Sequence, residues 1–102
     1  MLNQIKQWAS DRNLILGSTP HAQMVKLVEE MGELASGIAK NKTDDVEDAI
    51  GDCVVVLTII AAQYGMHIED CIASAYEQIK DRKGRMVDGI FIKEVDKSES
   101  LG

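Results

Sequence analysis

One stretch of the sequence is apolar for ten residues and constrains the fold more than any other feature. It runs from Cys53 to Ala62, and Thr58 is its single polar residue. The stretch lies inside a longer predicted helix that Gly65 ends, so this helix is apolar on every side. A helix of that kind has to be surrounded by other helices. We therefore expect it at the centre of a helical bundle or at an interface between copies of the chain.

Periodic apolar residues predict three further helices around this one. Thr19 is a suitable N-cap with Pro20 at the first helical position, and Thr43 is a candidate cap for the apolar helix. An aromatic content of 4% and a single proline also favour helices over a β fold with many turns. The predicted helices cover residues 2–13, 20–40, 43–64 and 68–83. The second has an apolar stripe of Met24, Leu27, Met31, Leu34 and Ile38.

The length of the chain, 102 residues, suits one domain. We expect an all-α, four-helix bundle-like domain over residues 1–92, assembled as an oligomer, followed by a flexible tail over residues 93–102. Between Val87 and Val95, Asp88-Gly89 separates two short apolar stretches. This pattern predicts either a small hairpin or a short extended arm.

Charge and composition exclude several classes of partner. The formal net charge of −6 disfavours binding to nucleic acid, although a phosphate ligand that arrives with divalent cations stays compatible. The amino terminus lacks the apolar core of a signal peptide, and the apolar stretch is too short to span a bilayer. Cys53 and Cys71 lie in apolar helical runs, which favours buried free thiols over a disulfide. We expect a cytoplasmic protein that binds neither nucleic acid nor membranes.

Acidic residues gather on one arc of each of the two central helices. Glu30 and Glu33 lie beside the apolar stripe of the second helix. Asp48 and Asp52 lie on an arc of the third helix that continues into core-facing apolar residues. Carboxylates that face each other repel, and hard oxygen ligands on rigid helices suit Mg²⁺ or Mn²⁺. The alternative is a pair of helices whose acidic edges are solvated, and the pattern alone does not decide between the two.

Two segments of these helices resemble the motifs of the MazG-like nucleotide pyrophosphohydrolases. Residues 26–34, Lys-Leu-Val-Glu-Glu-Met-Gly-Glu-Leu, resemble the family's Glu-Glu-x-x-Glu motif. Residues 48–52, Asp-Ala-Ile-Gly-Asp, resemble its second motif, usually Glu-x-x-Asp, before an apolar helix. Ala49 stands where the first acid of that second motif is usual, so Asp48 or Asp45 is expected to supply the missing oxygen.

The resemblance implies a magnesium-dependent enzyme that cuts a nucleoside triphosphate, ribo or deoxyribo, to its monophosphate and pyrophosphate. Mn²⁺ is an alternative metal. Either Glu29 or Glu30 would take the proton of the attacking water. The family forms dimers and tetramers, which implies a homo-oligomer, either a dimer or a tetramer built as a dimer of dimers. The implied metal ligands are Glu30, Glu33, Asp48 and Asp52.

Four residues are candidates for binding the substrate, and each also has a purely structural interpretation. Lys80 and Lys26 would hold phosphates, but Lys80 also suits a helix carboxyl end and Lys26 suits a pair with Glu30. Gln23 would read a base edge. Trp8 would stack on the base, or would lie in the core as a lone Trp on an amphipathic helix more often does.

Two other functions compete with hydrolysis. One is a non-catalytic helical dimer, regulatory or interacting, with a solvated acidic face. The other is a calcium-binding helix pair, which is disfavoured because residues 44–52 lack the central glycine and terminal glutamate of the usual loop.

Overall fold

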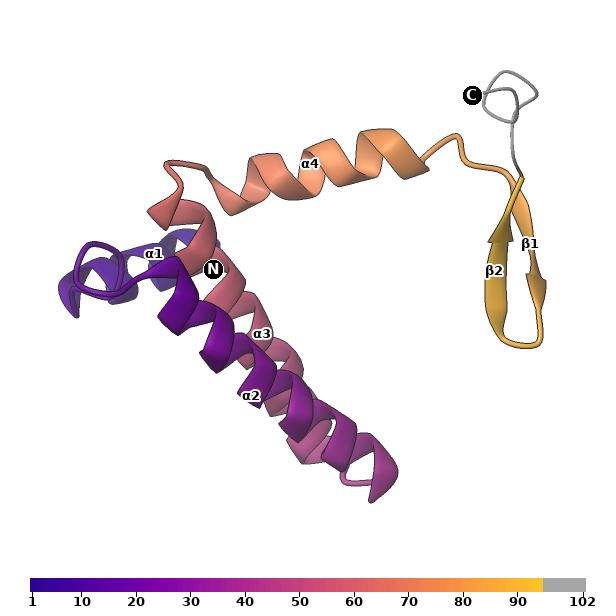
Figure 1. Cartoon of the computed structure of the whole chain (residues 1–102), viewed down its shortest axis with the longest axis horizontal. Coiled ribbons are helices and arrows are strands. Elements are labelled where there is room, and N and C mark those ends of the chain that lie inside the picture. The colour runs from indigo at the N-terminus through magenta and orange to yellow at the C-terminus, as the bar shows by residue number, and fades with distance from the viewer. Residues whose placement is uncertain (95–102) are drawn as a thin grey trace. The chain divides into compact units, whose positions relative to one another are not determined.

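Two long helices joined by a short loop carry both acidic motifs. The computed structural model describes residues 1–94. The elements in chain order are α1 (Leu2–Asp11), α2 (Pro20–Ala39), α3 (Thr43–Gln63), α4 (Ile68–Ile79), β1 (Gly84–Val87) and β2 (Ile90–Lys93). α2 and α3 pack side by side, and α1 packs against α3 (Figure 1). The chain divides into unit 1, Met1–Cys71, and unit 2, which starts at Ile72. Within residues 1–94 the fold is mostly helical with four helices, as predicted.

Local signals in the sequence set most of the helix ends. Thr19 caps α2 as predicted, since its hydroxyl accepts a hydrogen bond of 3.1 Å from the Ala22 amide, with Pro20 following in the first turn. The prediction for Thr43 is wrong, because Lys42 holds the N-cap position and makes no side-chain cap bond. Instead, the acidic side chains of Asp44 and Asp45 in the first turn of α3 interact favourably with the positive amino end of the helix dipole. After α3, Gly65 adopts a φ of 71°, which ends the helix as predicted.

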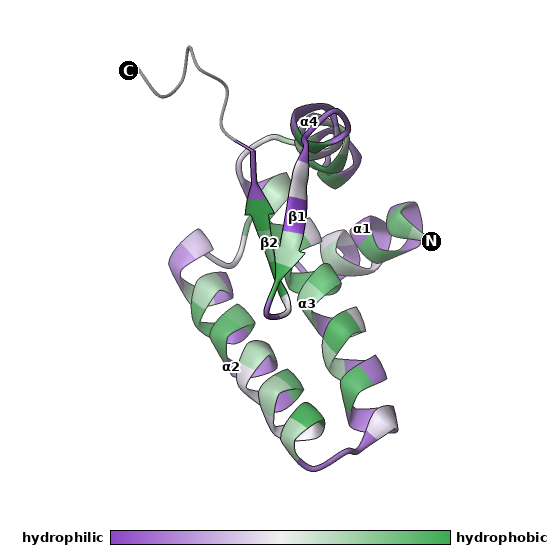
Figure 2. Ribbon diagram, turned by 90° about the vertical axis from the view of Figure 1, so that its right-hand side faces the viewer, coloured by the Kyte–Doolittle hydropathy of each residue, from purple (hydrophilic) through white to green (hydrophobic). Residues whose placement is uncertain are grey.

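The buried core of unit 1 is small and leaves the outer side of α2 and α3 uncovered. Of the predicted stripe on α2, Leu27 is buried, whereas Met24, Met31 and Ile38 are about half exposed. On α3 the predicted burial on every side is incomplete. α2 covers one side of α3 and α1 covers another part of it, which leaves the remaining surface of α3 open within unit 1. Hydrophobic residues lie along the length of both α2 and α3 (Figure 2). The buried apolar residues are Ala9, Leu27, Ala49, Val56, Ile59, Ala61 and Ile68, and those exposed on α3 include Ile50, Val54 and Leu57.

The two cysteines and the apolar stretch of α3 bear on two predictions from the sequence, free thiols and the absence of a membrane-spanning helix. Cys53 and Cys71 are both free, as the sequence predicted, but the expected burial is wrong: Cys53 is half-buried and Cys71 is exposed. Within the described part of the chain, no single helix has the length and apolarity to cross a bilayer. α3 and α4 meet that test by length and composition only when they are taken together across the bend between them.

Unit 2 contains most of α4 and a two-stranded hairpin. α4 ends at Ile79, four residues before the predicted end at residue 83, and Gly84 opens β1 instead of closing the helix. β1 and β2 pair antiparallel with Val87 opposite Ile90. Asp88 and Gly89 between them have φ values of 50° and 79°, the geometry of a type I′ turn. The hairpin is therefore present rather than an extended arm. Most of the predicted tail, from residue 95, lies outside the described residues.

Candidate metal and active site

Three carboxylates from two helices meet in unit 1. One carboxylate oxygen each of Glu30, Glu33 and Asp52 lies within 4.8 Å of the others. A three-residue step puts Glu30 and Glu33 on one face of α2. Ile59, two turns beyond Asp52 on α3, is buried at 3% exposure and keeps this side of α3 against its neighbours. The structure thus brings together three of the four acids for which the sequence predicted a shared metal.

Glu30 is the buried member of this acidic cluster. Its side chain is 5% exposed, and its Oε1 lies 3.1 Å from the ammonium nitrogen of Lys26. Its second oxygen, Oε2, is buried and has no hydrogen-bond partner within residues 1–94. A buried carboxylate oxygen without a partner is costly, and a cation bound at the cluster would satisfy it. This unpaired oxygen fits a metal ligand better than a solvated surface acid.

The shifts in pKa within the cluster indicate that Lys26 does not neutralise the negative charge of the three carboxylates. The negative charge of Glu30 raises the pKa of Glu33, and loss of solvation followed by the same charge raises the pKa of Asp52. The pKa of Glu30 is lowered, chiefly by the hydrogen bond from Lys26. Lys26 therefore stabilises chiefly the Glu30 carboxylate, and its weaker effect on Glu33 and Asp52 does not offset the causes that raise their pKa values. An oxygen-rich site with excess negative charge is suited to a divalent cation.

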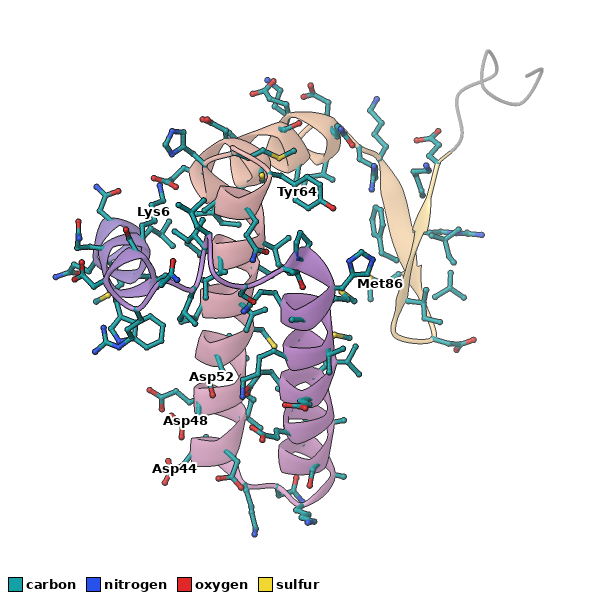
Figure 3. The ribbon with its side chains drawn as sticks, turned by 60° about the vertical axis from the view of Figure 1, so that its left-hand side comes forward. Lys6, Asp44, Asp48, Asp52, Tyr64 and Met86 are labelled. Carbon is teal, nitrogen blue, oxygen red and sulfur yellow. The ribbon has the colours of Figure 1, made fainter. Side chains whose placement is uncertain are left out.

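The predicted fourth ligand, Asp48, lies outside the group of three. It is exposed one turn before Asp52 on the same side of α3 (Figure 3), and its charge contributes to the raised pKa of Asp52. Asp45 is also exposed and lies where α3 passes close to Gly37 of α2. Ala49, at the position of the family's usual acid, is 1% exposed. An acid at that position would therefore be buried, and this chain places a small core residue there.

Trp8 lies beside the acidic cluster and is not a core residue. It is 42% exposed, so the core interpretation is wrong, and the guanidinium of Arg12 stacks over its ring at 4.7 Å from the centroid. A cavity of about 330 Å³ joins α1 to the carboxylate side of α3, and Gln4, Ile5, Trp8, Asp52 and Val55 line it. Sequence reasoning missed Gln4 and Ile5. Ile5 and Gln4 lie three and four residues before Trp8, and this helical spacing could have predicted that they share a face of α1 with it.

The other predicted substrate residues have partners of their own. The amide of Gln23 is buried and donates a hydrogen bond of 3.0 Å to the hydroxyl of Ser18, which secures the connector before α2. Lys26 contacts Glu30 and, at 3.9 Å, Glu29. Lys80 lies in unit 2, where its ammonium is 2.9 Å from a carboxylate oxygen of Glu77.

Glu29, one of the two predicted catalytic acids, differs from Glu30 in its surroundings. Its side chain is 61% exposed, and the long contact with Lys26 is its one ion pair within residues 1–94. It adjoins the acidic cluster in sequence but does not belong to the group of three. Its carboxylate is therefore accessible to water.

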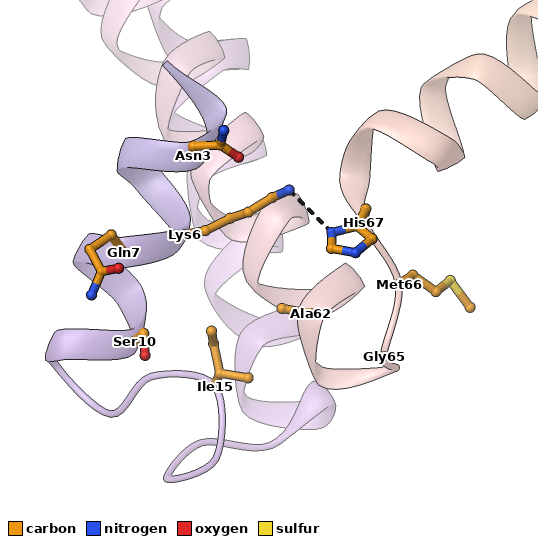
Figure 4. A pocket seen from close by; sticks show the side chains of 9 residues that line it. All are labelled: Asn3, Lys6, Gln7, Ser10, Ile15, Ala62, Gly65, Met66 and His67. Carbon is orange, nitrogen blue, oxygen red and sulfur yellow. Dashed lines mark hydrogen bonds between the residues drawn. The ribbon is translucent and has the colours of Figure 1, made fainter.

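A larger cavity of unit 1, about 560 Å³, contains no member of the acidic cluster (Figure 4). Here Lys6 of α1 reaches the beginning of α4, with its nitrogen 2.7 Å from Glu69 and 3.4 Å from His67 Nδ1. The hydrogen bond from Lys6 lowers the pKa of Glu69. This contact ties α1 to the first turn of α4. The cavity is lined by Asn3, Lys6, Gln7, Ser10, Ile15, Ala62, Gly65, Met66 and His67.

The region that carries both acidic motifs matches a known protein family. The MazG nucleotide pyrophosphohydrolase domain matches residues 18–87. An uncharacterised 18.2 kDa protein from the rep-hol intergenic region of Haemophilus phage HP1 (strain HP1c1) is 57% identical over 63 residues. That match covers 62% of this chain and 39% of the phage protein, so the chain spans well under half of this curated relative. No solved structure matches. Because the domain match covers more than half of its length, the chain belongs to the MazG nucleotide pyrophosphohydrolase domain family.

Proposed function

We propose that the protein hydrolyses nucleoside triphosphates to monophosphates and pyrophosphate with Mg²⁺, for which Mn²⁺ can substitute. The observation that carries this proposal is the acidic cluster, in which a buried oxygen of Glu30 has no partner within residues 1–94. Membership of the family supports the class of reaction. A solvated acidic face, as the non-catalytic alternative requires, would leave both Glu30 oxygens in water.

The residues present fit the metal by their chemistry and their charge. Glu30, Glu33 and Asp52 would hold it through hard oxygen atoms, and Asp48 would add an oxygen from the next turn of α3. When bound, magnesium neutralises phosphate charge and makes a bound water acidic enough to react near neutral pH. The Glu30 carboxylate pairs with Lys26 and would also bind the metal. Glu29 is exposed and is therefore the better acceptor for the water's proton.

The cavity at Trp8 would take the base of the same nucleotide. Trp8 and Asp52 line this cavity together, so a base stacked on the indole ring would leave its phosphates beside the carboxylates. Gln4 offers an amide that can donate to and accept from a base edge. Lys26 is the proposed phosphate-binding cation of unit 1. Lys80, the second cation expected to bind phosphate, belongs to unit 2, where it pairs with Glu77. Gln23 is less suited to this role because its amide already binds Ser18.

The proposal is tested by assaying pyrophosphate release from a panel of ordinary and modified nucleoside triphosphates. With Mg²⁺ present, some nucleotide should yield pyrophosphate, and chelation should stop the reaction. Glu33→Gln and Asp52→Asn should each abolish it with helicity unchanged. Glu47→Gln is the matched control, because Glu47 is an exposed acid of α3 outside the group of three. Activity that survives both cluster substitutions would refute the site.

A homo-oligomer is also part of the proposal. The uncovered outer side of α2 and α3 exposes Val28, Met31, Val54 and Leu57 over 37–56% of their surface. Packing against the same side of a second copy would surround α3, as its apolar sequence requires. The size of the protein in solution, measured by light scattering, tests this part separately from catalysis.

A further inference from the structure

Lys26 is the cationic side chain that contacts the buried acid of the cluster. Its ammonium nitrogen lies 3.1 Å from Oε1 of Glu30, whose side chain is 5% exposed. Its second ion pair, with Glu29, is longer at 3.9 Å. Within unit 1, no other lysine or arginine forms an ion pair with a member of the cluster. The positive charge that the protein itself supplies to this site therefore comes from one side chain.

The stability of α2 gives little reason for a lysine at this position. Lys26 and Glu30 are four residues apart on one helix, so their contact follows from the helix itself and not from the packing of other elements. For a pair at this step, however, the favourable order is glutamate first and lysine second, and here the order is reversed. The partner is also a buried carboxylate and not a surface one. The pair is therefore better explained by the charge of the site than by support of the helix.

A metal ion bound at Glu30 would meet the charge of Lys26 at close range. One Glu30 oxygen contacts the ammonium group, and the other, Oε2, is buried without a partner within residues 1–94. The charge of Lys26 also opposes the rise in the pKa of Glu33 and of Asp52, so it reaches all three carboxylates. Like charges repel, and even at the dielectric constant of water one unit charge a few ångströms away changes the binding of a divalent cation by about tenfold.

We propose that Lys26 is an internal counter-ion that competes with the divalent metal for Glu30, so that metal binding displaces the lysine from this carboxylate. The lysine then has two roles in sequence. It neutralises the buried acid before the metal binds, and its released ammonium group becomes available to a phosphate afterwards. The inference deepens the proposed function and rests on its metal site, but it concerns metal affinity and not hydrolysis.

Titration of the full chain with Mn²⁺, without nucleotide, tests this competition. The electron paramagnetic resonance signal of the free ion gives the bound fraction. Lys26→Met removes the charge and keeps an unbranched side chain, and it should bind Mn²⁺ about tenfold more tightly than the wild type. Lys26→Arg keeps the charge and should stay close to the wild type. Lys40→Met is the matched control, because it removes the same charge at the other end of α2, about 20 Å along the helix.

Thermal unfolding separates this role from a purely structural one. In chelator, Lys26→Met should lower the melting temperature, because the buried Glu30 carboxylate loses its partner. Saturating Mn²⁺ should then raise the melting temperature of the variant by more than it raises that of the wild type. A lysine that only supported the helix would leave the rise with Mn²⁺ unchanged. Lys26→Gln, which keeps a hydrogen-bond donor beside Glu30, is the second variant if Lys26→Met does not fold.

The outcomes distinguish this inference from the proposed hydrolysis. Mn²⁺ affinity that is equal to or weaker than that of the wild type in the folded neutral variants overturns the inference, as does absence of Mn²⁺ binding in all of them. If the wild type releases pyrophosphate and loss of the Lys26 charge does not change Mn²⁺ affinity, the inference alone fails. Tighter Mn²⁺ binding by the neutral variants, without hydrolysis of any nucleotide by the wild type, would refute the proposed reaction and support the counter-ion.

Discussion

Folding brings the charge of Glu33 towards Glu30, and it removes solvent from Asp52 and brings its charge towards Glu30 as well, so the pKa of each carboxyl is raised. We expect both charges to destabilise the metal-free protein. Replacing either charge by its neutral isostere removes the repulsion and keeps the shape. We therefore expect Asp52→Asn and Glu33→Gln to raise the melting temperature in chelator, although both abolish activity. Added Mg²⁺ should raise the melting temperature of the wild type by mass action and leave both variants unchanged. Thermal unfolding with and without Mg²⁺ measures this, and destabilised variants in chelator would contradict it.

The loss of solvation at Asp52, together with the repulsion from Glu30, gives the stability of the metal-free protein a predictable pH dependence. Because the pKa of Asp52 is raised in the folded state, the native protein binds a proton more readily than the unfolded chain does. Stability then falls as pH rises, from the ordinary carboxyl pKa of about 4 through the raised value. In chelator, the advantage of Asp52→Asn over the wild type should be absent below about pH 4 and should grow towards neutral pH. An advantage that is constant across this range would assign the effect to something other than this charge.

Substitution of Glu29 should distinguish proton transfer from metal binding, because the side chain is proposed to take part only in the first. If its exposed carboxylate accepts the water's proton, Glu29→Gln should lower kcat by about 10²- to 10⁴-fold. The Mg²⁺-dependent rise in melting temperature should persist, because Glu29 is outside the group of three acids. Steady-state kinetics and thermal unfolding of one preparation measure both. Near-normal kcat would transfer the role to Glu30.

At the scale of the helices, two glycines weaken α2 and α3 without an evident packing role. Gly32 and Gly51 lie in helix interiors, and a Cβ at either would meet no atom within 4 Å. Gly32→Ala and Gly51→Ala should each raise the free energy of unfolding by about 0.5–1 kcal/mol. Gly37→Ala is the control, since its Cβ would lie 3.2 Å from Val46 Cγ2 and should gain less. Denaturant titration measures all three. A loss at Gly32 or Gly51 would indicate that a second copy packs closely there.

The helices also show how far the sequence predicts this fold and site. The cluster of Glu30, Glu33 and Asp52 was predictable, because helical periodicity puts them beside apolar faces that must pack together and the family resemblance implies that they bind metal. The cap at Thr19 and the stop at Gly65 were predictable from local backbone chemistry. The exposure of Trp8 was not, because it depends on how α1 packs against α3, and periodicity does not specify the angle between helices. The early end of α4 carried no cap signal in the sequence.

For the whole molecule, the exposed apolar surface makes folding and association inseparable. Unit 1 buries few large side chains, while large apolar residues of α2 and α3 stay open to water, and proteins that are monomeric rarely expose so many together. Association stabilises the folded form by mass action, so the melting temperature should rise with protein concentration. Val28→Lys places a charge on the outer side of α2 and should reduce both the concentration dependence and the molecular mass. Asn3→Lys adds the same charge on exposed α1 and should change neither. A melting temperature of the wild type that stays constant over a hundredfold range of concentration, with the mass of a single chain, would show that this fold is stable without a second copy.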